Sequence, residues 1–193
     1  MELVAVLGSP RAPGNSASLA LHLLDTARKA GARTRAFQLN RLAFRGCQAC
    51  DACKGVSEVC VLNDDLAEVL EAVSKTDVLV LATPVYYGDV SGQMKCFIDR
   101  TFSYFTPDFR TATGRRSRLA PGKKLVFVQA QAHPDEAAFA GIFERYEYFL
   151  RFHGFDEAHV VRACGLLGPE AIQGRPEHFR HVEDLTPRLP AKG

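Results

Sequence analysis

Short apolar runs alternate with helical patterns along the whole chain, and this alternation restricts the fold more than any other feature. The apolar or extended runs predict five strands, at 3–7, 33–39, 78–82, 125–128 and 158–163. Between them, apolar residues recur every three or four positions, which predicts helices. Strands separated by helices form parallel sheets whose right-handed crossovers place helices on both faces. The sequence therefore predicts one doubly wound α/β domain over residues 1–193.

Two segments lack this periodicity. Residues 40–63 show no convincing helix or strand pattern, and they carry four of the six cysteines. A loop of this length is uncommon in a compact domain and is usually functional or disordered. The tail from about residue 165 is predicted to be partly irregular. We therefore expect chemistry in the cysteine-rich loop.

Composition excludes several classes of protein. Hydrophobic residues make up 47% of the chain and charged residues 24%, with 24 Lys and Arg against 22 Asp and Glu. These values exclude an intrinsically disordered chain and give no overall field that would attract nucleic acid or an anionic membrane. No run approaches the roughly 18–20 apolar residues of a membrane span, and the N-terminus lacks signal-peptide features. We expect a cytoplasmic protein, in which clustered cysteines more often serve metals or redox chemistry than disulfides.

The loop after the first strand has the composition of an anion-binding turn. Such a site needs inward backbone N–H groups, small residues and a helix N-terminus, here with Ser16 as the expected N-cap. The residues that meet this description are Gly8, Ser9, Gly14, Asn15 and Ser16, with the cation Arg11 beside them. An ordinary strand-to-helix turn is the alternative, although the arginine favours phosphate. The P-loop is excluded because Asn15, not Lys, precedes Ser16, and the dinucleotide fingerprint fails at Pro10.

The loop after the third strand contains two aromatic residues and a proline at the carboxyl edge of the predicted sheet. Its sequence is Thr83-Pro84-Val85-Tyr86-Tyr87-Gly88-Asp89-Val90-Ser91-Gly92. A flat heteroaromatic ring would find a stacking surface and backbone donors in such a loop. The alternative is that the two tyrosines only cap the core.

The motifs of these two loops, taken in order, resemble those of a known family. The chain is similar to the NADPH-dependent FMN reductase and iron–sulfur flavoprotein branch of the flavodoxin-like superfamily, from Glu2 to about Leu150. The residues that carry the resemblance are Gly8-Ser9-Pro10-Arg11, Gly14-Asn15-Ser16, Thr83-Pro84-Val85-Tyr86-Tyr87-Gly88, Ser91-Gly92-Gln93-Met94-Lys95 and Asp99-Arg100.

The resemblance implies a flavodoxin-like sheet in the order 2-1-3-4-5 and a bound FMN. It implies that the FMN phosphate is held by Ser9, Arg11, Asn15 and Ser16. The isoalloxazine ring would be lined by Pro84, Val85, Tyr86, Tyr87 and Gly88, with a third flavin loop at Gln129 and Ala130. Electrons would pass from NAD(P)H through FMN to a small acceptor such as a quinone or flavin, with no catalytic side chain required. Relatives assemble as dimers or tetramers, so a homodimer or homotetramer is expected.

The cysteine-rich loop contains Cys47-x2-Cys50-x2-Cys53-x6-Cys60, a spacing that lets one loop wrap a cubane cluster. A zinc site and four buried structural thiols are the alternatives. The resemblance implies a [4Fe–4S] cluster, because compact motifs of this kind are typical of iron–sulfur flavoproteins. A cluster would favour an electron carrier that is reduced by a ferredoxin-like partner. A third possibility is a non-redox binding module on a flavodoxin-like scaffold.

Overall fold

Five parallel strands form one sheet at the centre of the protein. The structure, a computed structural model, describes residues 1–189; residues 190–193 of the predicted domain lie outside this range. The sheet order is β2-β1-β3-β4-β5, which confirms the predicted order. The strands are β1 (Glu2–Leu7), β2 (Arg33–Gln38), β3 (Val78–Pro84), β4 (Lys123–Ala130) and β5 (Phe155–Ala163).

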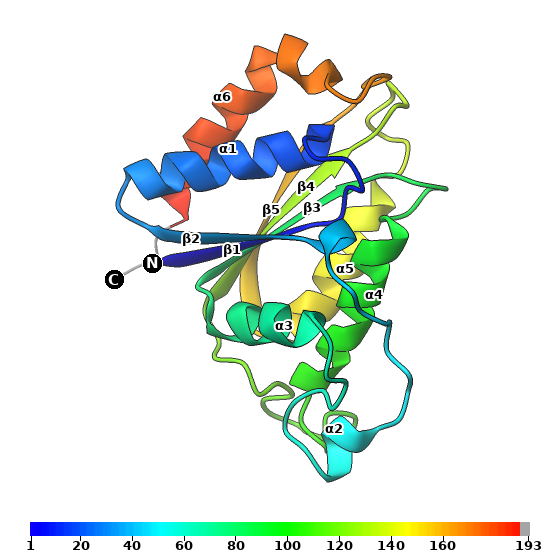
Figure 1. The fold of residues 1–193 in the computed structure, drawn as a ribbon. Coiled ribbons are helices and arrows are strands. Elements are labelled where there is room, and N and C mark those ends of the chain that lie inside the picture. The colour runs from blue at the N-terminus through cyan, green and yellow to red at the C-terminus, as the bar shows by residue number, and fades with distance from the viewer. Residues whose placement is uncertain (190–193) are drawn as a thin grey trace.

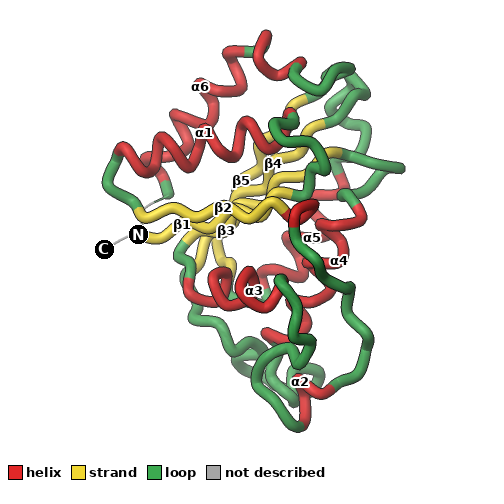
Figure 2. Tube along the Cα trace, in the orientation of Figure 1, coloured by secondary structure: helices red, strands yellow, loops and turns green. Residues whose placement is uncertain are grey.

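Helices cover both faces of this sheet, as predicted (Figure 1). One face carries α1 (Asn15–Lys29) and α6 (Pro176–Leu185). The other carries α3 (Leu66–Lys75), α4 (Gly92–Arg100) and α5 (Gly141–Arg151). The one-turn helix α2 (Ala52–Gly55) lies apart from the sheet, in the loop-rich lower end of the molecule in Figure 2. Short 3-10 helices lie at Leu39–Arg41, Thr101–Tyr104, Ala171–Gly174 and Thr186–Arg188.

The sheet divides the core into two layers, because successive strand side chains point to opposite faces. In β1, Leu3, Ala5 and Leu7 pack towards α1 and α6. Val4 and Val6 pack towards α3, α4 and α5. Strands β3 and β4 are buried on both faces, which explains why residues 78–82 and 125–128 are continuous apolar runs without alternation.

The N-cap of α1 differs from the prediction. Gly14, not Ser16, is the N-cap residue, and Ser16 already lies inside the first turn of the helix. The chain turns at Gly14 in an extended conformation, which glycine tolerates at this position. As a result the Ser16 hydroxyl does not cap the helix. The helix ends at Lys29, before Gly31, whose φ of 89° is a conformation that favours glycine after a helix.

The two segments without sequence periodicity have different structures. The cysteine-rich loop 40–63 is irregular apart from one 3-10 turn and α2. The tail is more regular than predicted, because α6 buries Val182 and Leu185 against α1. His22 of α1 also hydrogen-bonds Glu183 of α6 at 2.7 Å. The tail thus belongs to the α1 layer.

Candidate functional site

The loops that follow β1, β3 and β4 meet at one edge of the sheet, because the carboxyl ends of parallel strands point the same way. In the order β2-β1-β3-β4-β5, the connection from β1 leads to β2 and the connection from β3 leads to β4, so the two connections leave in opposite directions along the sheet. Ligands of open α/β sheets bind at such a switch point. The three predicted flavin loops therefore surround the expected position of a ligand.

The loop after β1 forms a cradle for an anion. Ser9 is buried, and its Oγ accepts a hydrogen bond of 3.2 Å from the backbone N–H of Arg11. A Cβ at Gly14 would collide with Ser9 Oγ, so only glycine leaves this space open. Ser16 is 1% exposed, and its Oγ has no hydrogen-bond partner among residues 1–189. The first N–H groups of a helix are free of intrahelical partners, so donors converge on this cradle.

The side chain of Asn15 is held by the C-terminal tail. Its Nδ2 donates to the carbonyl oxygen of Gly168 at 2.8 Å, and its Oδ1 accepts from the N–H of Ile172 at 3.1 Å. Asn15 therefore offers its backbone N–H to the cradle, while its amide contacts the tail. The sequence pattern gave no sign of this contact, which joins residues more than 150 positions apart.

Ser91 connects the loop after β1 to the loop after β3. Its Oγ donates to the carbonyl oxygen of Gly8 at 2.6 Å and caps α4 by accepting from the N–H of Met94 at 3.3 Å. The N–H of Ser91 in turn donates to Thr83 Oγ1 at 3.0 Å. One buried hydroxyl therefore fixes two of the three candidate flavin loops relative to each other.

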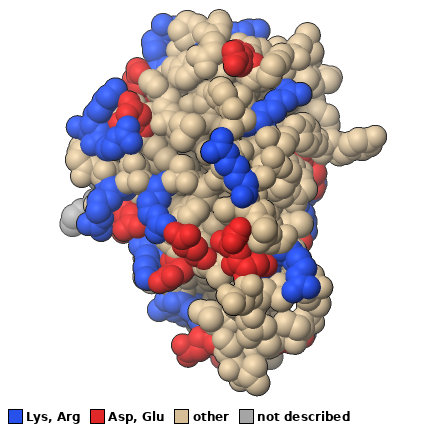
Figure 3. All heavy atoms as spheres, in the orientation of Figure 1, with Lys and Arg blue, Asp and Glu red and all other residues tan. Residues whose placement is uncertain are grey.

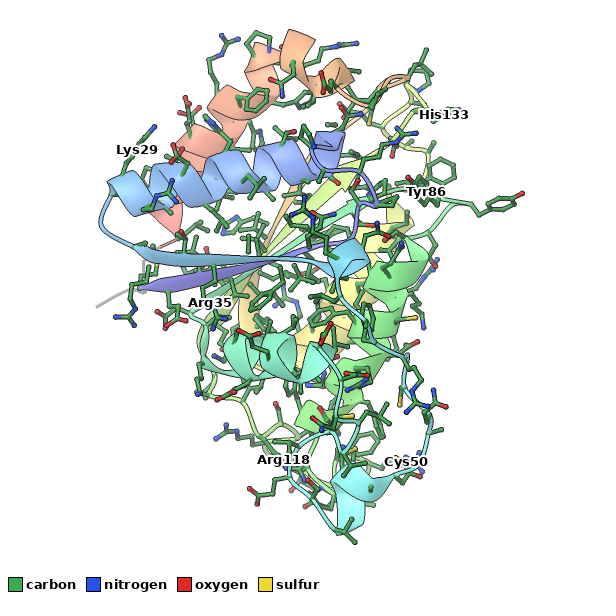
Figure 4. All side chains as sticks on the ribbon, in the orientation of Figure 1. Lys29, Arg35, Cys50, Tyr86, Arg118 and His133 are labelled. Carbon is green, nitrogen blue, oxygen red and sulfur yellow. The ribbon has the colours of Figure 1, made fainter. Side chains whose placement is uncertain are left out.

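The loop after β3 is a tight turn that projects beyond the sheet (Figure 1). Tyr86 and Asp89 exchange backbone hydrogen bonds of 2.8 and 3.0 Å around Tyr87 and Gly88. Both central residues have positive φ, 51° and 75°, as in a type I′ turn. Tyr87 is fully exposed, whereas Tyr86 is 43% exposed at the carboxyl end of the sheet (Figure 4). The aromatic side chains do not cap the core, so the alternative of a core cap is wrong for Tyr87.

Asp89 anchors this turn to α5. Its carboxylate accepts hydrogen bonds of 2.8 Å from Arg145 Nη1 and from the Tyr146 hydroxyl. Burial, together with the hydrogen bond to Asp89, raises the pKa of Tyr146 well above its usual value. The Tyr146 hydroxyl therefore stays protonated and remains a donor to Asp89.

The predicted third flavin loop is tied to the second. The carbonyl oxygen of Ala130 accepts a hydrogen bond of 2.8 Å from the N–H of Val85. Gln129 is fully buried, and its Nε2 donates to Gln131 Oε1 at 3.0 Å and to the Phe139 carbonyl at 3.3 Å. Gln129 Oε1 has no partner within the described part of the chain. A buried, unpaired amide oxygen is an acceptor available to a ligand.

The four cysteines of the cysteine-rich loop line one small hollow of about 20 Å³. Cys47 and Cys50 are exposed, and Cys53 and Cys60 are half-buried. Ala49 and Asp51, between the first three cysteines, have φ of 51° and 52°, an uncommon backbone that often marks functional sites. No group of three or more Cys, His, Asp or Glu side chains in residues 1–189 is arranged to hold a metal ion.

Three cations attach the cysteine-rich loop to the body of the protein. Arg100 is 1% exposed and binds Asp64 at 2.8 Å together with the carbonyl oxygens of Arg45 and Leu62. Arg118 donates to the carbonyl oxygen of Cys53 at 3.0 Å (Figure 4). Lys54 donates to the carbonyl oxygens of Phe102 and Phe105, and burial lowers its pKa. These cations place positive charge beside the cysteines.

Charges of both signs are intermixed on the face of the molecule shown in Figure 3. This distribution agrees with the near balance of 24 cationic and 22 anionic side chains. Among the described helices, none has the length and apolarity to cross a membrane.

The sheet order and the anion cradle at the switch point define a flavodoxin-like α/β protein. A family model described as NADPH-dependent FMN reductase matches residues 1–139. The chain belongs to this family, as the resemblance in its sequence predicted.

The known relatives include iron–sulfur flavoproteins and FMN-dependent NADH:quinone oxidoreductases. An iron–sulfur flavoprotein of Archaeoglobus fulgidus is 36% identical over 140 residues, which are 72% of this chain and 59% of that protein. An FMN-dependent NADH:quinone oxidoreductase of Rhizobium meliloti is 31% identical over 55% of this chain and 53% of its own length. The chain thus spans little more than half the length of these relatives.

Solved structures support the fold over the whole chain. An FMN-dependent NADH-azoreductase from Bacillus anthracis, in complex with FMN, has a TM-score of 0.73 and is 15% identical over 98% of this chain and 99% of its own. An NAD(P)H:quinone oxidoreductase from Methanothermobacter marburgensis has a TM-score of 0.74 and is 17% identical over 98% and 96% of the two chains.

Proposed function

We propose that this protein is an FMN-dependent oxidoreductase that passes electrons from NAD(P)H to a small acceptor such as a quinone or flavin. The observation that carries the proposal is the cradle at the start of α1, where the buried Ser16 hydroxyl lacks a partner among residues 1–189. The names of the relatives, which include FMN-dependent NADH:quinone oxidoreductase, support the same chemistry.

The residues of the three loops fit the parts of FMN. Ser9, Arg11, Ser16 and the backbone N–H of Asn15 are proposed to hold the phosphate. The ring is proposed to lie against Pro84, Val85, Tyr86, Tyr87 and Gly88, with Gln129 and Ala130 at its edge. Bound FMN supplies the hydride and electron chemistry, and the protein supplies position and access. The exposed Tyr86 and Tyr87 are proposed to form the surface on which nicotinamide or quinone stacks, and no side chain is assigned as a catalytic acid or base.

Replacing Arg11 by Ala should weaken FMN binding by about tenfold to a hundredfold, because a charge-assisted hydrogen bond to the phosphate is lost. The affinity for riboflavin, which lacks the phosphate, should be almost unchanged. Both dissociation constants can be measured by fluorescence titration of the apoprotein.

Lys29→Ala is the matched control for Arg11→Ala, because it removes a cation from the far end of α1 (Figure 4). Its FMN affinity should equal that of the unchanged protein. An unchanged FMN affinity in Arg11→Ala would contradict the phosphate assignment. A wild-type protein that binds no FMN would favour the non-redox binding module.

A second candidate function is electron transfer through a [4Fe–4S] cluster held by Cys47, Cys50, Cys53 and Cys60. The supporting observation is that these four thiols line one hollow beside Arg100, Arg118 and Lys54, whose charges would offset those of four thiolates. Because no three of the described ligand-type side chains are arranged to bind one metal ion, binding requires the thiols to move towards one another. The cluster would exchange single electrons with a ferredoxin-like donor.

Replacing Cys50 by Ser should remove most of the iron and acid-labile sulfide, because the cluster would lose one of its four ligands. Both should be assayed on protein purified without air. Cys96→Ser is the control, since Cys96 lies in α4 outside the motif, and it should keep the full content of iron and sulfide. Zinc in place of iron, or no metal in the unchanged protein, would rule out the cluster.

Three further expectations stay predictions. They are the homodimer or homotetramer, the cytoplasmic location and the ferredoxin-like partner. Sedimentation of the FMN-loaded protein tests the first of them.

A further inference from the structure

We propose that Asn15 is a positioning residue that couples the C-terminal segment 168–172 to the recognition of the FMN phosphate. Through its contact with the Asn15 side chain, this segment holds the first turn of α1 in the conformation that accepts a phosphate. The inference rests on the proposed FMN function and adds to it a part of the chain outside the family match at residues 1–139.

Asn15 makes a two-point contact with the tail. Its Nδ2 donates to the Gly168 carbonyl at 2.8 Å, and its Oδ1 accepts from the Ile172 N–H at 3.1 Å. Both ends of the amide are therefore engaged, and the side chain has one defined orientation. Turning this amide towards the cradle would break the two-point contact with the tail.

The tail segment is itself firmly seated. Ile172 is fully buried and belongs to the same core cluster as Leu19 and Leu23 of α1. Gln173 and Arg175 continue the segment with backbone hydrogen bonds to Glu170 and Ile172. The segment is thus a fixed support against which the start of α1 can be held.

The start of α1 needs such a support, because its N-cap is Gly14. Glycine has no side chain that could fix the first turn by the usual capping hydrogen bond. The Asn15 contact replaces this cap from the next position along the helix. It thereby fixes the direction of the Asn15 and Ser16 N–H groups and of the buried Ser16 hydroxyl, which has no partner within residues 1–189.

The test compares Asn15→Ala with His22→Ala. Each variant removes a side-chain contact between α1 and the tail, but only the Asn15 contact lies at the proposed phosphate loop. His22 lies further along α1, where its side chain hydrogen-bonds Glu183 of α6. Asn15→Ala should weaken FMN binding by about tenfold and riboflavin binding by less than about twofold. His22→Ala should leave both affinities unchanged, since the FMN phosphate does not depend on that contact. Thermal unfolding of both variants reports any general loss of stability.

Hydrogen exchange in the unchanged protein tests the coupling without a substitution. If the tail supports phosphate binding, binding must in turn stabilise the tail contact, because coupling between two sites is reciprocal. FMN should therefore slow the exchange of the Ile172 amide, and riboflavin should not. Faster exchange at Ile172 on adding FMN would mean that Asn15 leaves the tail to contact the phosphate, which overturns the proposal.

The remaining outcomes separate the two proposals. If the unchanged protein prefers FMN to riboflavin and Asn15→Ala keeps that preference, the positioning role is wrong and the FMN function stands. Equal weakening of FMN and riboflavin binding by Asn15→Ala would also contradict the positioning role. If the unchanged protein shows no preference for FMN, the proposed phosphate site is wrong, and the positioning role fails with it.

Discussion

Replacing Arg100 by Met is expected to lower the free energy of unfolding by about 3–5 kcal/mol, because the variant leaves a partly buried carboxylate without its charged partner and two carbonyl groups without this donor. Arg100 is 1% exposed and binds Asp64 through both terminal nitrogens, at 2.8 and 3.2 Å. It also donates to the carbonyl oxygens of Arg45 and Leu62, on either side of the cysteines. The measurement is urea unfolding at neutral pH, and the local effect should be loss of order in the cysteine-rich loop.

Lys95→Met is the matched control on the same helix. Lys95 and Asp99 form an ion pair of 2.6 Å, but both side chains are exposed to solvent. Exposed pairs of this kind contribute little, so the free energy of unfolding should change by less than about 0.5 kcal/mol. Equal small effects of both substitutions would show that the Arg100 contacts do not hold the loop.

Arg100→Met should also change how the free energy of unfolding depends on pH in the acid range. Burial alone would raise the pKa of Asp64, but the hydrogen bonds from Arg100 and from the backbone N–H groups of Arg45 and Leu66 outweigh it and hold the pKa below 3.8. The stabilisation from this group is present above pH 3.8 and is lost as the pH falls through the lower, folded-state pKa. Arg100→Met should therefore lose less stability on acidification than the unchanged protein. A steeper acid loss in the variant would contradict this assignment.

Replacing Gly8 by Ala is expected to lower the free energy of unfolding by about 2–4 kcal/mol and FMN affinity by at least about tenfold. An added Cβ would lie 2.8 Å from Ser91 Oγ and 2.9 Å from Met94 Cβ. Both neighbours are fully buried, so they have little room to move. The displacement would also break the hydrogen bond from Ser91 Oγ to the Gly8 carbonyl, which joins the loop after β1 to the loop after β3. Chemical unfolding and an FMN titration measure the two effects.

Gly92→Ala is the control for this substitution. Gly92 begins α4, one residue after Ser91, and an added Cβ would meet no described atom within 4 Å. Alanine also favours helix, so stability should be unchanged or higher by up to about 1 kcal/mol. If Gly8→Ala behaves like Gly92→Ala, the close packing of Gly8 against α4 does not define the site.

The sequence determined those features that depend on neighbours along the chain. The continuous apolar run at 78–82 predicted a central strand, and β3 is buried from Val78 to Thr83. The two glycines and two prolines of residues 8–14 predicted a turn between β1 and α1. The absence of periodicity in 40–63 predicted the long irregular loop. Each of these features depends on interactions between residues that are close in the chain, so the local pattern of residue types is enough to predict it.

Some local features were decided by the tertiary structure instead. Ser16 has the residue type of an N-cap, yet α1 begins at Asn15, because the turn at Gly14 packs against Ser9. The helix α6 forms in a polar segment because α1 offers an apolar surface for Val182 and Leu185. The cysteines gain positively charged neighbours from the end of α4, through Arg100, and from the segment before β4, through Arg118, which the sequence does not place beside them.

The contacts that define the candidate site are those that only the tertiary structure decided. Asn15 contacts Gly168, Ser91 contacts Gly8, and Arg100 contacts Leu62, across separations of 153, 83 and 38 residues. In each contact the acceptor is a backbone carbonyl, which every residue type carries. The sequence can therefore show which side chains are able to donate a hydrogen bond, but it does not identify the distant backbone carbonyl that accepts it.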